Sequence, residues 1–231
     1  MAAAFAAKQA ISTAASSAMR GVQDEFSSAS RAFGISSQPS SASTTIDWQN
    51  YNYPPFLRIV HYDLSELPSH VASIVWLINF SFILTVVICV VNFFNTIIIA
   101  AGGGSGVWVV YSILNLVLFP TAAGYTFYKG YKGLAATSPS AVRTFMWCQG
   151  ILCVLYLLFS ILPAGAFNGW ARFSWFKHYN MSKGMKNYWV FVIIVESILY
   201  TANFIIAGVN LLKVHNFNPY HSAQAMSGGF V

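Results

Sequence analysis

Long apolar stretches with almost no charge dominate the last two thirds of the sequence. No formally charged residue occurs between Glu66 and Lys129, a run of 62 residues, and a second uncharged run separates Arg143 from Arg172. About 20 apolar residues are enough for one helix to cross the hydrocarbon of a bilayer. The longer run therefore predicts two crossings, divided at the glycine-rich segment 102–106, which cannot sustain a helix.

These runs predict four membrane spans. The last run lies between Lys186 and Lys213 and is interrupted by a single acid, Glu196. A tryptophan lies near the start of every span, as is typical of the membrane–water interface. We predict an all-α membrane protein with four transmembrane helices in an antiparallel bundle, and kinks at Pro120 and Pro163. The predicted spans are 74–98, 107–127, 145–167 and 188–212.

Composition supports a membrane protein and disfavours other classes. Hydrophobic residues make up 56% of the 231 residues and charged residues 8%, with a net charge of +6. A soluble domain carries about 25% charged residues, so a water-soluble enzyme is excluded for the chain as a whole. No two Lys or Arg residues are adjacent, which disfavours nucleic acid as a partner. The histidines show no metal-ligand spacing, so we expect no enzyme activity, metal or cofactor.

The segments outside the spans differ in character. Residues 1–46 are rich in Ala and Ser and predict a flexible cytosolic arm, disordered or weakly helical, with a mitochondrial transit peptide as the alternative. Residues 47–73 form an aromatic and proline-rich pre-membrane segment, for which paired prolines favour an extended backbone. The bundle then occupies 74–212, and 213–231 form a cytosolic tail.

An even number of spans places both termini on one side of the membrane. Charge counting barely distinguishes the two sides, because five cations lie on the side of the termini and four on the other. No secretory signal peptide precedes the first span, which favours cytosolic termini. The sequon that begins at Asn180 would then face the lumen as a candidate glycosylation site.

The connection between the second and third spans combines tyrosines with cations. We expect a loop over 128–134, followed by a Ser/Pro-rich stretch that ends at Arg143. Tyrosines insert at headgroup level while lysines contact anionic lipid, at about 1 kcal/mol per cation. Ordinary interfacial anchoring is the alternative interpretation. The candidate lipid-binding residues are Tyr128, Lys129, Tyr131, Lys132 and Arg143.

Glu196 lies about one third of the way into the fourth span. An acid within the membrane is a candidate functional residue, which would relay a proton or coordinate an ion. The alternative is a structural carboxyl group, bonded to Ser197, to Gln149 or to an asparagine of another span. Because no span contains Lys, Arg or a second acid, we favour the structural role.

The residues Asn52-Tyr53-Pro54-Pro55-Phe56, followed by Asp63 and by Glu66-Leu67-Pro68, resemble the secretory carrier membrane protein (SCAMP) family. Leu118-Phe119-Pro120 is similar to the family's second span, and Phe127-Tyr128-Lys129-Gly130 occupies the place of its Trp-Tyr-Arg-Pro loop. Glu196-Ser197 resembles a pair in the last span of plant members. The chain departs from the family in two ways. Its amino-terminal arm has no Asn-Pro-Phe repeats, and Lys129 replaces the loop arginine.

The resemblance implies a tetraspan protein of vesicle trafficking with cytosolic termini. Such proteins move among Golgi, secretory vesicles, endosomes and plasma membrane, and act in exocytosis and recycling. Partners would be membrane lipids, with phosphoinositides at the cytosolic loop, and trafficking proteins, within a homo-oligomer or a larger membrane complex. Two alternatives stay open from the residues themselves: a small ion- or proton-conducting subunit that uses Glu196, and a structural tetraspan subunit.

Overall fold

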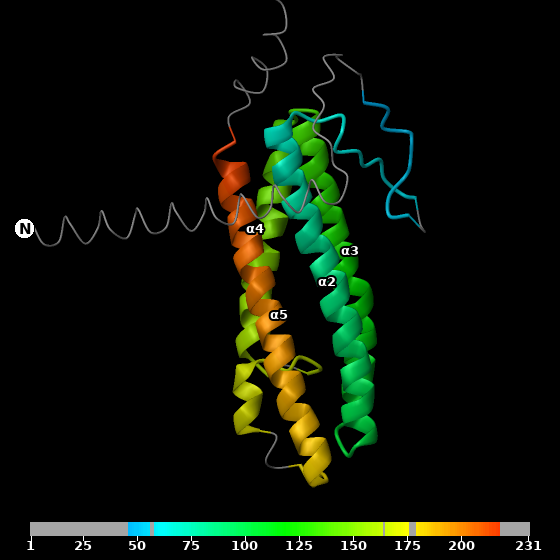
Figure 1. Ribbon diagram of the computed structural model, residues 1–231, viewed down its shortest axis with the longest axis vertical. Helices are drawn as coiled ribbons and strands as arrows, with labels where there is room; N and C mark the ends of the chain where they lie inside the picture. Colours follow the sequence, from blue (N-terminus) through cyan, green and yellow to red (C-terminus); the bar gives the residue numbers. More distant parts are fainter. Residues whose placement is uncertain (1–45, 56–57, 164, 176–178, 218–231) are drawn as a thin grey trace, which may run out of the picture. The chain divides into compact units, whose positions relative to one another are not determined.

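The computed structural model describes residues 46–55, 58–163, 165–175 and 179–217 (Figure 1). Four long helices are present in this part of the chain, with one short 3-10 helix, η1, at Trp170–Ser174. All four are long and apolar enough to cross a membrane, which confirms the predicted all-α, four-span architecture. The predicted amino-terminal arm, 1–46, lies outside the described residues except for Ile46. The long helices are α2 (Ser69–Ala101), α3 (Val107–Ala135), α4 (Pro139–Ile161) and α5 (Lys183–His215).

Consecutive helices run in opposite directions, and each packs against two neighbours. Helix α2 contacts α3 and α5, and α4 contacts the same two helices. The start of α2 and the end of α3 therefore lie at the same end of the bundle, together with the start of α4 and the end of α5 (Figure 1). We call this the upper end, after its place in Figure 1, and the opposite one the lower end.

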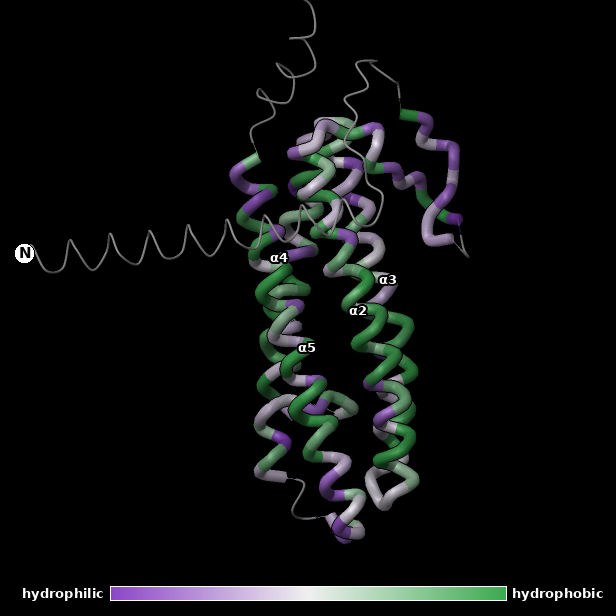
Figure 2. Tube along the Cα trace, in the orientation of Figure 1, coloured by the Kyte–Doolittle hydropathy of each residue, from purple (hydrophilic) through white to green (hydrophobic). Residues whose placement is uncertain are grey.

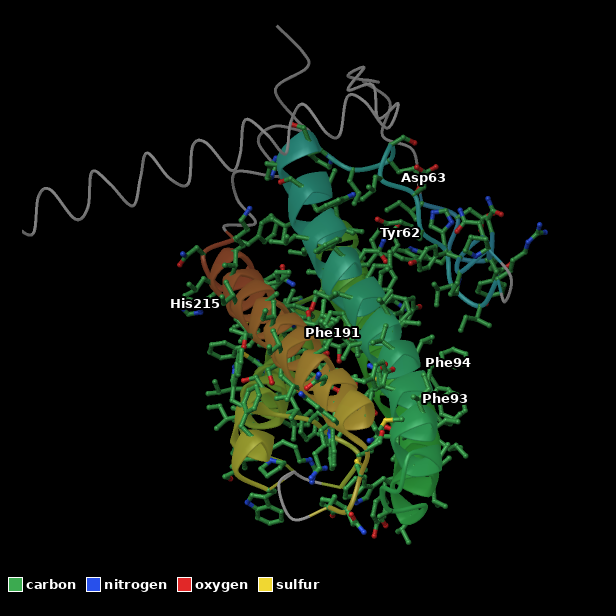
Figure 3. The ribbon with its side chains drawn as sticks, turned by 60° about the horizontal axis from the view of Figure 1, so that its bottom comes forward. Tyr62, Asp63, Phe93, Phe94, Phe191 and His215 are labelled. Carbon is green, nitrogen blue, oxygen red and sulfur yellow. The ribbon has the colours of Figure 1, made fainter. Side chains whose placement is uncertain are left out.

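The bundle is apolar on its outside and carries polar groups inside. Figure 2 shows hydrophobic residues along the middle of all four helices and hydrophilic residues gathered toward the two ends. Large apolar side chains such as Phe94 and Phe191 are 58% and 60% exposed, whereas Asn92 and Glu196 are fully buried (Figure 3). Exposed apolar area of this extent is stable when lipid surrounds the helices.

The expected loop over 128–134 is wrong, because α3 continues through Pro120 as far as Ala135. The connection to α4 is a tight turn at residues 136–138, in which Thr137 has a φ of 48°. Gly133 allows this close connection. A Cβ atom there would lie 2.9 Å from the backbone nitrogen of Val142 in α4. The candidate cations Lys129 and Lys132 are therefore held on a helix.

The predicted third span, 145–167, is wrong beyond Ile161, where α4 ends. Pro163 explains the end of the helix, because proline has no N–H and forces the preceding residue into an extended conformation. Leu162 accordingly has φ −88° and ψ 140°. The chain then turns back against the bundle, where the Ala166 carbonyl accepts a hydrogen bond from Asn92 of α2 at 2.8 Å. We call residues 162–163 and 165–169 the returning loop.

The predicted pre-membrane segment, 47–73, ends at Pro68, because α2 begins at Ser69, and from here the name is used for the residues that precede α2. Its described residues, 46–55 and 58–68, fold back on themselves and dock beside the upper end of α2 and α3. Tyr53 and Val60 form an antiparallel bridge, with reciprocal backbone hydrogen bonds of 2.9 Å. The paired prolines therefore lie where the chain reverses direction. The extended backbone that the sequence favoured for them is wrong at this point. Leu67 of the segment is buried with Val71 and Val75 of α2, so the segment is continuous with the core of the bundle.

Candidate functional site

An aromatic cluster joins the pre-membrane segment to α3 at the upper end. The ring of Tyr62 makes two contacts with α3, at centroid distances of 5.3 Å to Phe127 and 5.6 Å to Tyr131. Trp48 lies 5.6 Å from Tyr131, and Tyr53 lies 5.6 Å from Phe127. Such pairs contribute about 0.5–1.5 kcal/mol each beyond the area that they bury. Tyr131, predicted to contact lipid, is instead fully buried beneath the pre-membrane segment.

Hydrogen bonds fix the segment in this position. The Tyr53 hydroxyl donates to Asn79 Oδ1 of α2 at 2.8 Å. The backbone N–H of Asp63 donates to the Tyr131 hydroxyl at 3.4 Å, and Figure 3 places Tyr62 and Asp63 beside α2 near the upper end. Burial raises the pKa of Tyr53 and of Tyr62, so both hydroxyls stay protonated at neutral pH.

The predicted pre-membrane motif, Asn52 to Phe56, supplies part of this structure. The Asn52 side chain donates to the carbonyl of Tyr62 at 3.1 Å and accepts from its backbone N–H at 2.8 Å. Tyr53 carries the bridge and the contact to α2, and Pro54 and Pro55 lie in the reversal. Phe56 lies outside the described residues. The sequence indicated this motif by resemblance, and the contacts of Asn52 and Tyr53 give two of its residues a physical role.

His61 lies at the centre of the segment and was not among the predicted site residues. Its Nε2 is 2.8 Å from Glu66 Oε2 and its Nδ1 is 3.0 Å from the Asn50 carbonyl oxygen. Burial alone would lower the pKa of His61. The hydrogen bonds to Glu66 and Asn50, with the negative charges of Glu66 and Asp63, outweigh burial and raise that pKa overall. Both ring nitrogens therefore face acceptors, an arrangement that a protonated imidazole satisfies.

The candidate lipid-binding cations gather at the upper end. Lys129 Nζ lies 5.3 Å from the ring centroid of Tyr125. Lys132 Nζ lies 5.7 Å from the ring of Trp48 and 5.9 Å from that of Tyr128. Arg143 is exposed near the start of α4, just beyond the tight turn. The structure thus brings all five predicted lipid-binding residues to the upper end of the bundle, but Tyr131 is buried there beneath the pre-membrane segment.

A second polar site surrounds Glu196 in the lower half of the bundle. Its Oε1 accepts a hydrogen bond from Asn95 Nδ2 of α2 at 2.9 Å. Its Oε2 accepts from Asn92 Nδ2 of α2 at 2.8 Å and from Asn168 Nδ2 of the returning loop at 3.0 Å. We call these four residues the Glu196 network. The network ties three separate parts of the chain to one carboxyl group.

Two further donors fix which way the amides point. Trp189 Nε1 donates to Asn168 Oδ1 at 2.9 Å, and the Tyr188 hydroxyl donates to Asn95 Oδ1 at 2.8 Å. With their oxygens occupied, both amides present N–H groups to Glu196, which suits an ionised carboxylate. The contacts predicted for Glu196 are therefore partly confirmed, because asparagines of another helix bind it.

Two other predicted contacts of Glu196 are wrong. The Ser197 hydroxyl donates instead to the Asn168 carbonyl at 3.1 Å. Gln149 is buried in α4 without a partner for its Nε2 among the residues described. The sequence analysis missed Asn168, because residues 162–169 adjoin a span that seemed to continue to residue 167. Pro163 was the sequence feature that could have indicated the end of the helix before residue 167.

Arg172 of η1 holds the other side of the returning loop. Its buried guanidinium donates to the carbonyls of Gly165 and Phe167, at 2.6 Å and 3.3 Å, and stacks 4.6 Å from the ring of Trp108. Within the described ranges, no group of His, Cys, Asp and Glu side chains is placed to hold a metal ion.

The candidate glycosylation site is at the opposite end of the molecule from the cations. Asn180 is exposed just before α5, at the lower end of the bundle. The hydroxyl of Ser182, which completes the sequon, accepts a hydrogen bond from Met185 N at 3.3 Å and caps α5. Glycosylation of Asn180 stays a prediction.

Comparison with known proteins places the chain in a family. The family model described as the SCAMP family matches residues 50–220, which include the pre-membrane segment from Asn50 onward and all four long helices. Neither a search of curated proteins nor a search of solved structures gave a match. The length of the family match, together with the four apolar helices, shows that this chain is a multi-pass membrane protein of the SCAMP family, a family of membrane trafficking proteins.

Proposed function

We propose that the protein acts in vesicle trafficking, in post-Golgi secretion, exocytosis and endosomal recycling, by binding lipids and trafficking proteins rather than by catalysis. The observation that carries this proposal is the gathering of Lys129, Lys132 and Arg143 at the upper end, beside exposed and half-buried tyrosines. In this proposal the upper end faces the cytosol, where anionic lipids, including phosphoinositides, are found.

The magnitude of the lipid contribution follows from the charges. Each Lys or Arg near an anionic surface contributes about 1 kcal/mol, and salt weakens this attraction within about a Debye length. Lys129 and Lys132 lie on the last two turns of α3, one turn apart, so one headgroup can contact both ammonium groups. Tyr128, whose ring centroid lies 5.9 Å from Lys132 Nζ, supplies an amphipathic ring of the kind that favours the membrane interface.

Replacing both Lys129 and Lys132 with glutamine is expected to weaken phosphoinositide binding about 30-fold, since two cations contribute about 2 kcal/mol. The affinity is measured by titrating water-soluble, short-chain phosphatidylinositol bisphosphate into the full chain in nanodiscs of neutral lipid, at low and high salt. Lys183/Lys186→Gln, at the lower end, is the matched control and should retain the affinity. Equal losses in the two double variants, or binding that ignores salt, would contradict the proposal.

Membrane orientation has a separate test at Asn180. If the lower end faces the lumen, Asn180 lies where the glycosylation machinery acts, and its exposed side chain is available. Expression in cells should then give a glycosidase-sensitive species that disappears in Asn180→Gln. As control, a sequon engineered at Ser140 of the upper end should stay unmodified. Modification at the upper-end position would reverse the proposed orientation.

The Glu196 network gives no specific support to an ion- or proton-conducting subunit. Three amide N–H groups point at the carboxylate, and they occupy the positions that a cation would need. A structural subunit of a larger membrane complex, or of a homo-oligomer, is a distinct outcome. Stoichiometric co-purification of the full chain with one assembly, from mild detergent, would favour that outcome.

A further inference from the structure

We propose that the face of α3 that carries Tyr131 and Lys132 has two competing occupants: the pre-membrane segment, held in place by a protonated His61, and the anionic headgroups of a membrane surface. This inference rests on the proposed function, because it describes how lipid binding at the upper end is regulated. Its two parts, a proton-dependent latch and a competition with lipid, are tested by separate measurements.

The covering of this face is visible in the contacts of Trp48. Its ring lies 5.6 Å from that of Tyr131 and 5.7 Å from Lys132 Nζ. A cation over an aromatic face is attracted by about 0.5–2 kcal/mol, so the docked segment engages the charge that a lipid phosphate would bind. Tyr131 is fully buried while the segment is docked. The lipid headgroups and the segment therefore compete for the same ammonium group, Lys132 Nζ, and for the same aromatic ring, that of Tyr131.

The latch consists of His61 and its two acceptors. Nε2 faces the Glu66 carboxylate at 2.8 Å, and Nδ1 faces the Asn50 carbonyl at 3.0 Å. A neutral imidazole has one N–H, so one nitrogen would turn its lone pair toward an oxygen. Only the imidazolium donates to both. The bond to the Asn50 carbonyl fixes the backbone two residues from Trp48, so the protonation of His61 is coupled to the position of the Trp48 ring.

The surroundings of His61 agree with this coupling. Glu66 and Asp63 of the segment favour its positive charge. From α3, the Tyr131 ring lies 6.3 Å from the His61 ring as an uncharged neighbour. The charge of Lys132 lies over the ring of Trp48, which is 6.1 Å from the His61 ring. The pKa of His61 is raised in the docked segment. Protonation therefore stabilises docking fully below the pKa of a free histidine, about 6.5, and this contribution is lost as the pH rises through the docked pKa.

Release would expose the face of α3 without unfolding the bundle. The part of the segment that carries Trp48 and His61 can move away while Leu67 stays buried with Val71 and Val75 of α2 and the four helices stay packed. Lys132 would lose its contact with Trp48, and Tyr131 would become available to the interface. A rise in cytosolic pH is then expected to favour the lipid-bound arrangement, and a fall in pH the covered one.

Spin labels report docking directly. Gln49 and Ser140 are exposed, on the segment and at the start of α4. With labels at these two positions, in the full chain with its three native cysteines replaced and in neutral nanodiscs, we expect a narrow distance distribution near about pH 6 and a broad one near about pH 8.5. His61→Ala should be broad at both values. His215→Gln, which removes an exposed histidine of α5, is the matched control and should behave as the parent chain.

Short-chain phosphatidylinositol bisphosphate is the lipid probe. At about pH 6, His61→Ala is expected to bind it about threefold to tenfold more tightly than the parent chain, because the competing segment is released. At about pH 8.5 the two should bind alike. Comparing the variants at one pH cancels the titration of the lipid phosphates. Glu66→Gln, a second variant that keeps the size of the side chain, should release the segment at a lower pH than the parent chain does.

The outcomes separate the two parts. If the distance distribution between the labels at Gln49 and Ser140 changed neither with pH nor with the His61 substitution, the latch would be overturned, even if the lipid still binds. A working latch combined with equal lipid affinity of the parent chain and His61→Ala at about pH 6 would overturn the competition. If no variant binds the phosphoinositide at either pH, the proposed lipid function itself fails and the competition fails with it, while the spin-label result still decides the latch.

Discussion

Replacing Glu196 with leucine is expected to lower the free energy of unfolding by at least about 3 kcal/mol. The substitution leaves the N–H groups of Asn92, Asn95 and Asn168 without their acceptor in a buried site, and each unsatisfied group costs about 1–3 kcal/mol. The measurement is reversible unfolding of the full chain in mixed micelles with rising denaturing detergent. Glu196→Gln should lie between the parent chain and the leucine variant.

Neighbouring bonds limit how far the network can rearrange. Asn168 cannot reverse its amide, because Trp189 Nε1 is a donor only and already binds Asn168 Oδ1. Asn95 has more freedom, since the hydroxyl of Tyr188 can either donate or accept. The glutamine variant therefore keeps a carbonyl oxygen for Asn168 and Asn92, and its new amide N–H can donate to Asn95 only if Asn95 reverses its own amide.

Gln149→Leu is the matched control for the leucine variant. Gln149 is also buried in a spanning helix, but its Nε2 has no partner in the described part of the chain. Removing an unpartnered polar group should leave the free energy of unfolding unchanged or raise it. Equal losses in the two variants would contradict a specific role for the Glu196 network. A stable Glu196→Gln protein that has lost a measured ion or proton flux would instead support the conducting alternative.

The four helices could be predicted from the sequence because the bilayer leaves few choices. Backbone groups in hydrocarbon must bind one another, so an uncharged run of sufficient length is helical. The ends of the helices were harder to predict. α3 extends past Lys129 and Lys132 because Gly130 and Gly133 let α4 approach, which is a property of the packing. α4 ends at Ile161 because Pro163 follows, a local signal that the apolar run concealed.

The candidate sites likewise combine features that the sequence predicts with features that depend on how distant segments pack. Cations at one end of the bundle follow from the span boundaries, and the structure places Lys129, Lys132 and Arg143 there. The burial of Tyr131 depends on Trp48, which lies far away in the sequence, so no local pattern predicts it. The partners of Glu196 were predicted by type, as asparagines of another helix, because few other groups satisfy an acid inside a bundle.

Replacing Gly133 with leucine is expected to destabilise the protein by about 3 kcal/mol, at the upper end of the range for overpacking. The new Cβ would lie 2.9 Å from the backbone nitrogen of Val142 and 3.2 Å from its Cα. Backbone atoms cannot rotate away as a side chain would, so α3 and α4 must separate at the turn. The same unfolding measurement in mixed micelles reports the loss.

Gly150→Leu, within α4, supplies the comparison that isolates this contact. No heavy atom lies within 4 Å of a Cβ built at Gly150. Leucine also favours helix over glycine by about 1 kcal/mol, so this variant should be as stable as the parent chain or more stable. If Gly133→Leu were equally harmless, the tight turn would not be what holds α4 against α3.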